Sequence, residues 1–213
     1  MNPALFRLLV EATGYTVALS AVSIVAGLAV GLAVATAMLS RRRALSMPAR
    51  AFVSFFRGVP LLVQLLLIYN LLPSVGIDLP GIVAAAIGLT LCTAAYQAET
   101  LRGGFAGVPR GLVEAADMVG LTPVQLFWRI RVPIAVKLTL PSLVSEAIMI
   151  LKASSLVSVV GVVELTRMAQ DLAASTYRPL PIYATAGALY IAVDWGIAGL
   201  GHALERRSRW GRA

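Results

Sequence analysis

The chain has 213 residues, of which 59% are hydrophobic and only 13% are charged. Soluble domains are about one-quarter charged, so this composition excludes an ordinary soluble domain and indicates an integral membrane protein. The net charge of +8 would suggest nucleic-acid binding in a soluble protein, but in a membrane protein the placement of charges matters more than their sum. A single cysteine and a single histidine exclude a disulfide framework and a multi-ligand Cys/His metal site. We therefore expect neither a metal nor a bound cofactor.

The first long apolar segment predicts a membrane span over residues 15–39. It is longer than the ~7–15-residue apolar core of a secretory signal peptide, and it ends in the arginine run 41–43, which is typical of a stop-transfer segment. Small residues recur at every fourth position along it: Ser23, Gly27, Gly31 and Ala35. They predict a seam where a neighbouring helix approaches closely, although such residues also occur on helices that have no partner.

Further apolar segments predict membrane spans at about residues 59–72, 82–98, 138–163 and 182–204. The sequence therefore predicts an all-α integral membrane protein with five transmembrane helices, forming one domain over residues 1–213. Most arginines and lysines lie in three places: residues 41–57, residues 102–137 and the C-terminal tail. Only Arg7, Arg167 and Arg178 lie on the opposite side. By the positive-inside rule the N-terminus faces outward and the segment between the third and fourth spans is cytoplasmic.

That cytoplasmic segment, residues 109–133, predicts a hairpin of two short helices. Pro109 suits the first position of a helix, where its missing N–H costs nothing. Leu112, Ala116 and Val119 recur at helical spacing and predict one apolar face. The first helix of the hairpin should therefore be amphipathic.

The turn and the second helix of the hairpin have their own local signals. Gly120 favours the left-handed conformation that ends a helix. Thr122 and Gln125 have the spacing of a capping box, with a proline between them at the first helical position. We expect Pro133 to end the second helix.

A helical hairpin of this size allows three interpretations: a surface hairpin without a special role, a DNA-binding helix-turn-helix, or an element that a partner protein grips. A DNA-recognition helix must enter a groove ~8.5 Å deep. Here both ends of the hairpin are tethered close to the bilayer, so we expect no nucleic acid as a partner.

Ionisable residues lie inside two predicted spans: Glu146 and Lys152 in the fourth and Asp194 in the fifth. Such residues are functional candidates, and the alternative is a structural pairing between helices. Glu146 and Lys152 are six residues apart and lie on roughly opposite sides of the helix, so we do not expect them to pair within it. Lys152 shares a helical face with Ser155, and Ser154 shares one with Ser158, so this span offers a polar stripe that suits a pathway for a hydrophilic solute.

The sequence does not support an enzymatic function. Neither lysine follows a glycine, so there is no phosphate-binding Walker A loop. No Gly-x-Ser occurs, which argues against a nucleophile elbow. We expect no catalytic residue, and any ATP hydrolysis that drives transport must belong to another chain.

The hairpin and its flanks resemble the permeases of ABC importers. Glu114-Ala115-Ala116, Gly120, Ile130 and Val132-Pro133 match the signature E-A-A-x3-G-x9-I-x-L-P, with valine in place of leucine. Three other segments resemble motifs of the polar amino acid branch, of the histidine/glutamine/arginine type: FRGVPLLVQ (56–64), AYQAETLRGG (95–104) and ILKASSLVS (150–158). The resemblance covers about residues 51–207.

The resemblance implies a type I ABC importer permease fold whose hairpin is the cytoplasmic coupling helix. The residues implied to contact the ATPase are Glu114, Ala115, Ala116, Gly120, Arg129, Ile130, Arg131 and Pro133. The residues implied to line the substrate pathway are Tyr96, Glu99, Lys152, Ser154 and Ser155.

The resemblance also implies a multi-pass protein of the bacterial cytoplasmic (inner) membrane, surrounded by membrane lipid. The implied partners are a dimer of cytoplasmic ATP-binding subunits, a second permease subunit that is either identical or paralogous, an extracytoplasmic solute-binding protein and a polar amino acid. Glu146 stands where the family often has asparagine, which favours a cationic amino acid or an opine-like derivative. The alternative function is a channel or secondary transporter that works without an ATPase. Inverted repeats would favour that alternative, and the sequence shows none.

Overall fold

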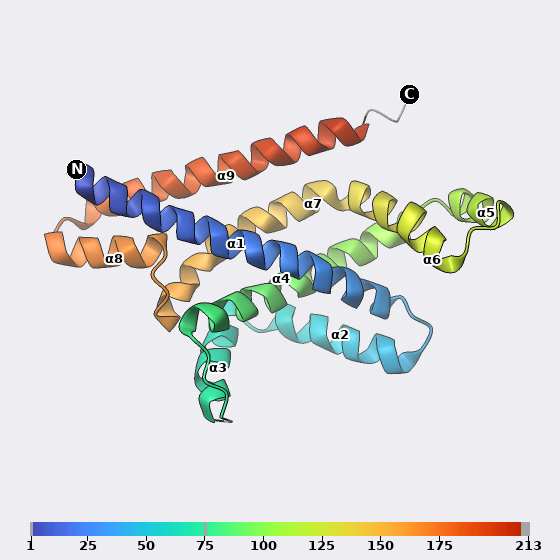
Figure 1. The fold of residues 1–213 in the computed structure, drawn as a ribbon, viewed down its shortest axis with the longest axis horizontal. Coiled ribbons are helices and arrows are strands. Elements are labelled where there is room, and N and C mark those ends of the chain that lie inside the picture. Colours follow the sequence, from blue (N-terminus) through green and yellow to red (C-terminus); the bar gives the residue numbers. More distant parts are fainter. Residues whose placement is uncertain (1, 75, 210–213) are drawn as a thin grey trace.

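The computed structural model describes residues 2–74 and 76–209, which form helices joined by short turns, with no strand among them (Figure 1). In chain order the elements are α1 (Pro3–Met38), α2 (Arg43–Gly58), α3 (Leu61–Ser74), α4 (Gly81–Ala106), α5 (Arg110–Met118), α6 (Pro123–Leu126), a π-turn (Phe127–Arg131), α7 (Val132–Ala153), a 3₁₀ segment (Ser154–Val160), α8 (Leu165–Thr176) and α9 (Pro179–Arg209). The all-α fold expected from the sequence is confirmed.

Four helical stretches within the described residues are long and apolar enough to cross a membrane: Pro3–Met38, Gly81–Ala106, Pro123–Val160 and Pro179–Arg207. A fifth crossing arises when α2 and α3 are counted together, and these two helices meet at a bend of 107°. With 14 residues, α3 alone is about 21 Å long, which is shorter than the ~30 Å apolar core of a bilayer. The span expected at residues 59–72 is therefore the second limb of a bent pair rather than a straight crossing helix.

The bend between α2 and α3 is fixed by Pro60 and Gln64. Because a proline follows it, Val59 is pushed out of the helical region, and it adopts an extended conformation with φ −92° and ψ 132°. The side-chain amide of the buried Gln64 donates hydrogen bonds to the carbonyls of Phe56 (2.9 Å) and Val59 (2.7 Å). Gln64 thus satisfies carbonyls that the end of α2 leaves free, and holds the two limbs at their angle.

The small-residue seam predicted on the first span is where α1 packs against α4. All four residues of the seam are buried: Ser23, Gly27, Gly31 and Ala35. A Cβ atom built on Gly27 would lie 2.7 Å from the Cγ2 of Thr93, and one built on Gly31 would lie 3.0 Å from the carbonyl oxygen of Ala94. The close approach of a neighbouring helix is confirmed.

The helices that contain the first and fourth expected spans begin well before those spans. The helix that contains the first span already begins at Pro3, where the side chain of Asn2 caps it by accepting a hydrogen bond from Ala4 N–H. The expected fourth span, 138–163, is part of a helical run that starts at Pro123 and becomes 3₁₀ after Ala153. Gly161, with φ +79°, ends the 3₁₀ segment.

Candidate functional site

The turn of the hairpin has the geometry that the sequence predicts. Gly120 has a φ of +74°, the left-handed conformation that glycine adopts without a steric penalty. Its N–H donates to the carbonyl of Asp117 at 3.0 Å, and the N–H of Leu121 donates to the carbonyl of Ala116 at 3.1 Å. These two bonds form a Schellman motif, which satisfies the last carbonyls of α5.

The second helix begins with the expected capping box. The N–H of Gln125 donates to Oγ1 of Thr122 at 3.3 Å, and the N–H of Thr122 donates to Oε1 of Gln125 at 3.0 Å. The capping residue Thr122 directly follows Leu121, the last residue of the Schellman motif. The angle between α5 and α6 is therefore fixed by local hydrogen bonds rather than by packing against the rest of the chain.

The expectation that Pro133 ends the second helix is wrong, because α6, the π-turn and α7 form one continuous helical run. In an ordinary α-helix the proline ring clashes with the carbonyl four residues earlier, and the missing N–H leaves that carbonyl unpaired. Here the π-turn lies directly before the proline, and the N–H of Val132 donates to the carbonyl of Phe127, five residues earlier. The wider π-turn accommodates the proline within a continuing helix.

The predicted coupling residues lie mostly on the surface of the hairpin. Those that are exposed are Glu114, Ala115, Gly120, Arg129, Arg131 and Pro133. Ala116 is buried, and Ile130 is partly buried. The described part of the chain leaves most of the expected apolar face of the first helix uncovered, since Leu112 is 46% exposed and Val119 is 76% exposed. Of the three residues of that face, Ala116 alone packs inward.

The tip of the hairpin is apolar and exposed, a feature that the sequence reasoning missed. The exposed fractions are 89% for Met118, 76% for Val119 and 67% for Val124. The signal in the sequence was an apolar residue on each side of the glycine turn. We call Met118, Val119 and Val124 the hairpin tip. In Figure 1 α5 and α6 lie at the opposite end of the molecule from α8. A cluster of exposed apolar side chains beside charged ones is typical of a surface that binds another protein.

Two of the intramembrane charges pair with each other across helices. Nζ of Lys152 in α7 lies 3.1 Å from Oδ2 of Asp194 in α9, with side-chain exposures of 61% and 15%. Asp194 therefore pairs with a residue on a neighbouring helix, which is the structural role that was the alternative to a functional one. Lys152 still leaves most of its side chain accessible.

The carboxylates of Glu99 and Glu146 also have partners within the chain. Glu99 forms a salt bridge with Arg102, one turn further along α4, with 2.5 Å between Oε1 and Nη2. Glu146 of α7 accepts a hydrogen bond from the hydroxyl of Thr100 in α4. Glu99 and Arg102 line an open groove of about 580 Å³ between α4 and α7.

Tyr96 lies in a different pocket, of about 310 Å³, between the α2–α3 bend, α4 and α7. The guanidinium of Arg57 sits over its ring, 5.3 Å from the ring centroid, which is a cation–π contact. Ala153, next to Lys152 in the chain, lines the same pocket. Sequence reasoning did not assign Arg57 to the pathway, although it belongs to the FRGVPLLVQ motif.

The two predicted pathway serines differ. Ser154 is fully buried and donates a 2.6 Å hydrogen bond to the carbonyl of Leu151, so its hydroxyl is engaged within its own helix. Ser155 is partly exposed. The structure therefore places Tyr96 and Glu99 in separate pockets, and of the two serines only Ser155 is accessible.

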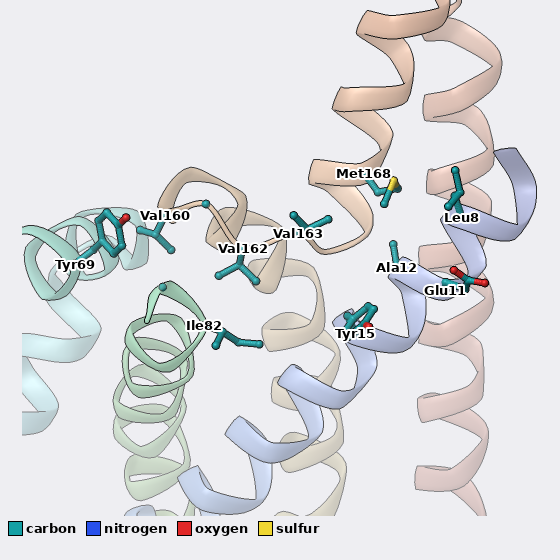
Figure 2. Close-up of a pocket in the computed structure, with 12 residues that line it drawn as sticks. Leu8, Glu11, Ala12, Tyr15, Tyr69, Ile82, Val160, Val162, Val163 and Met168 are labelled. Atoms are coloured by element: carbon teal, nitrogen blue, oxygen red, sulfur yellow. The ribbon is translucent and has the colours of Figure 1, made fainter. Parts of the chain in front are cut away.

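A further pocket, of about 580 Å³, lies where the first turns of α1 and α4 meet the 3₁₀ segment and α8 (Figure 2). Its labelled side chains include Glu11 and Tyr15 from α1, Tyr69 from α3 and Ile82 from α4. The pocket lies at the end of the molecule that holds the N-terminus, which the positive-inside rule places outside.

A buried polar cluster joins α1, α8 and α9 near the same end. Glu164 caps α8, because its carboxylate accepts hydrogen bonds from the N–H groups of Thr166 (2.9 Å) and Arg167 (2.8 Å). Tyr190 of α9 donates to the same carboxylate at 3.0 Å, and Thr16 of α1 accepts the N–H of the first residue of α8. Burial raises the pKa of Glu164 above its ordinary value, and the hydrogen bonds that its carboxylate accepts partly oppose that shift.

The chain is similar in sequence to a known family of transport proteins. The family described as "Binding-protein-dependent transport system inner membrane component" matches residues 23–210. The octopine transport system permease protein OccM of Rhizobium meliloti is 38% identical over 205 residues, covering 90% of this chain and 82% of that protein. The probable amino-acid ABC transporter permease protein YckA of Bacillus subtilis is 34% identical over 202 residues, covering 95% of this chain and 89% of that protein.

A solved structure described as an amino acid ABC transporter with histidines shares the fold, with a TM-score of 0.85, 34% identity and coverage of 94% of both chains. The family match covers most of the chain and includes the hairpin and the bent pair. The chain therefore belongs to the binding-protein-dependent transport system inner membrane components, the permeases of ABC transporters.

Proposed function

We propose that this chain is the membrane-spanning permease subunit of an ATP-driven importer for polar amino acids, and that it couples closure of the ATP-binding subunits to alternating access. The observation that carries the proposal is the exposed hairpin tip, held by a glycine turn and a capping box and continuous with α7. A tip that this chain leaves uncovered suits a groove on a partner protein. Its helical continuity with α7 would transmit a displacement of the hairpin to the membrane as a rigid-body movement.

The proposal assigns ATP hydrolysis to a dimer of separate cytoplasmic subunits. It also includes a second permease subunit, because five helices cannot enclose a full pathway, and an extracytoplasmic solute-binding protein. The relatives named for octopine and amino-acid transport favour a polar amino acid or an opine-like derivative as cargo. The accessible Lys152, paired with Asp194, offers a charged contact for such a solute.

The test is uptake by the assembled complex in proteoliposomes, with ATP hydrolysis measured on the same samples. Ala115→Trp places a bulky ring on the exposed face of the hairpin. We expect it to weaken binding of the ATP-binding subunits and to abolish uptake, while the protein remains in the membrane. The matched control is Ala51→Trp, on an exposed position of α2 outside the hairpin, which should retain uptake.

Two results would overturn the proposal. Uptake and subunit binding in Ala115→Trp equal to those of the wild type would remove the hairpin from the coupling surface. Transport by the purified permease without any ATP-binding subunit would instead support the alternative, an ATPase-independent channel or secondary transporter.

A further inference from the structure

A groove of about 530 Å³ runs along the C-terminal half of α1, between this helix and the π-turn. It is lined by Ala29, Leu32, Ala33, Thr36, Ala37, Ser40, Leu45, Phe127 and Trp128. In Figure 1 the end of α1 and its turn into α2 lie at the same end of the molecule as α5 and α6. The positive-inside rule places this end at the cytoplasmic surface of the bilayer.

The shape of the groove suits an extended hydrocarbon chain. Ala29, Ala33 and Ala37 recur at every fourth position, so small side chains form its floor along one face of α1. At its rim, Leu45 is 51% exposed and Trp128 is 56% exposed. The structure gives the indole N–H of Trp128 no hydrogen-bond partner within residues 2–74 and 76–209, so this donor is available to a ligand. Tryptophan is enriched at the boundary between hydrocarbon and headgroups.

One end of the groove is strongly cationic. Arg41, Arg42 and Arg43 form the turn between Ser40 and Leu45 in the chain, and both of these flanking residues line the groove region. All three arginines are exposed, and none forms a salt bridge within the part of the chain that the structure describes. Among the described residues that line the groove, none is acidic. The groove is thus apolar along its floor and positively charged at its mouth.

We propose that this groove binds one anionic phospholipid of the cytoplasmic leaflet, with an acyl chain along the alanine floor and the phosphate headgroup at Arg41, Arg42 and Arg43. An anionic lipid combines in one molecule the two chemistries that the groove presents side by side. A zwitterionic lipid would fill the floor but would leave the arginines uncompensated. This inference requires only that the chain spans a membrane, so it does not depend on the coupling role of the hairpin.

The test measures which lipid lies next to Trp128. Trp195 and Trp210 are replaced by phenylalanine, and the single-tryptophan protein is reconstituted in vesicles of phosphatidylcholine and phosphatidylglycerol of fixed composition. In separate samples the acyl chains of one lipid or of the other carry bromine, which quenches the fluorescence of an indole that it contacts. Each arginine near an anionic surface contributes about fivefold in affinity. We therefore expect brominated phosphatidylglycerol to quench at least about fivefold more efficiently than brominated phosphatidylcholine.

The triple variant Arg41→Gln, Arg42→Gln, Arg43→Gln should lose this preference. The matched control removes the same charge elsewhere on the cytoplasmic side, through Arg110→Gln, Arg206→Gln and Arg207→Gln, and should keep it. A further variant, Ala33→Phe, fills the floor of the groove and should reduce quenching by both lipids while the arginines remain. Thermal unfolding in detergent establishes that each variant is folded.

Three outcomes would overturn the proposal. Equal quenching by the two brominated lipids in the wild-type background would show that Trp128 touches unselected bulk lipid. Absence of quenching by either lipid would show that another protein subunit covers the groove. An equal loss of preference in the control triple variant would show that the overall surface charge, rather than this turn, attracts the lipid.

Discussion

Substitution of Gly120 should weaken coupling through the backbone alone. A Cβ atom built at this position meets no atom within 4 Å, so steric conflict with neighbours does not contribute, and only the φ of +74° matters. An L-residue in this conformation costs about 1–2 kcal/mol, with alanine near the lower value and the β-branched valine near the upper. The population of the intact turn should therefore fall relative to its open forms by about 5-fold for Gly120→Ala and about 30-fold for Gly120→Val.

The assay is the affinity of the ATP-binding subunits for the permease, together with uptake in proteoliposomes. The two substitutions should reduce both quantities in the order Ala, then Val, while Gly120→Asn should be tolerated better, because asparagine visits the left-handed region more readily. Gly111 provides the matched control: it lies inside α5, a Cβ there also meets nothing within 4 Å, and its φ is not positive. Gly111→Ala should therefore be neutral or slightly favourable. Equal damage from Gly111→Ala and Gly120→Ala, or normal coupling in Gly120→Val, would refute the reasoning.

The remaining predictions use thermal unfolding of the purified protein in detergent as the measurement. Gly31→Val should destabilise the fold by about 1–3 kcal/mol, because the added carbons meet the backbone of α4 at 3.0 Å. Gln64→Leu removes two buried hydrogen bonds at the α2–α3 bend and should cost about 1–3 kcal/mol. Lys152→Met and Asp194→Asn together should be less destabilising than Lys152→Met alone, which leaves a largely buried carboxylate without its cation. Because the raised pKa of Glu164 makes the folded chain bind more protons above the ordinary carboxyl pKa, stability should fall as the pH rises through that window, and Glu164→Gln should flatten this slope.

The features that could be predicted from the sequence are those whose hydrogen bonds close within a few residues. The left-handed Gly120 and the capping box of Thr122 and Gln125 are local, so the residue types alone specify them. The small-residue seam was also readable, because a four-residue period on one helical face identifies a surface that a neighbour can approach, even though the identity of that neighbour, α4, was not predictable.

The features that could not be predicted depend on the surrounding structure rather than on the residue type or its spacing alone. Pro133 is a helix breaker by its own chemistry, but the π-turn before it changes the hydrogen-bond spacing and lets the helix continue. The helical period of Leu112 and Val119 predicted an apolar face, but periodicity cannot say whether the surface that covers such a face belongs to the same chain. The pairing of Lys152 with Asp194 joins residues far apart in sequence, so only the packing of α7 against α9 reveals it.

The two arms of the hairpin join the membrane helices in different ways, and this asymmetry bears on the proposed coupling. The arm through α5 reaches α4 across a short non-helical link that ends at Pro109, whose ψ of 130° is extended. The other arm belongs to the 38-residue helical run Pro123–Val160, which has no loop within it. A helix resists bending far more than an irregular link does, so a displacement of the hairpin would reach the membrane mainly through α7. Lys152 lies at the far end of α7, where it is tied to α9 through Asp194. In the proposed mechanism the movement of the hairpin would therefore act on this interhelical ion pair, while the link to α4 absorbs the difference between the two arms.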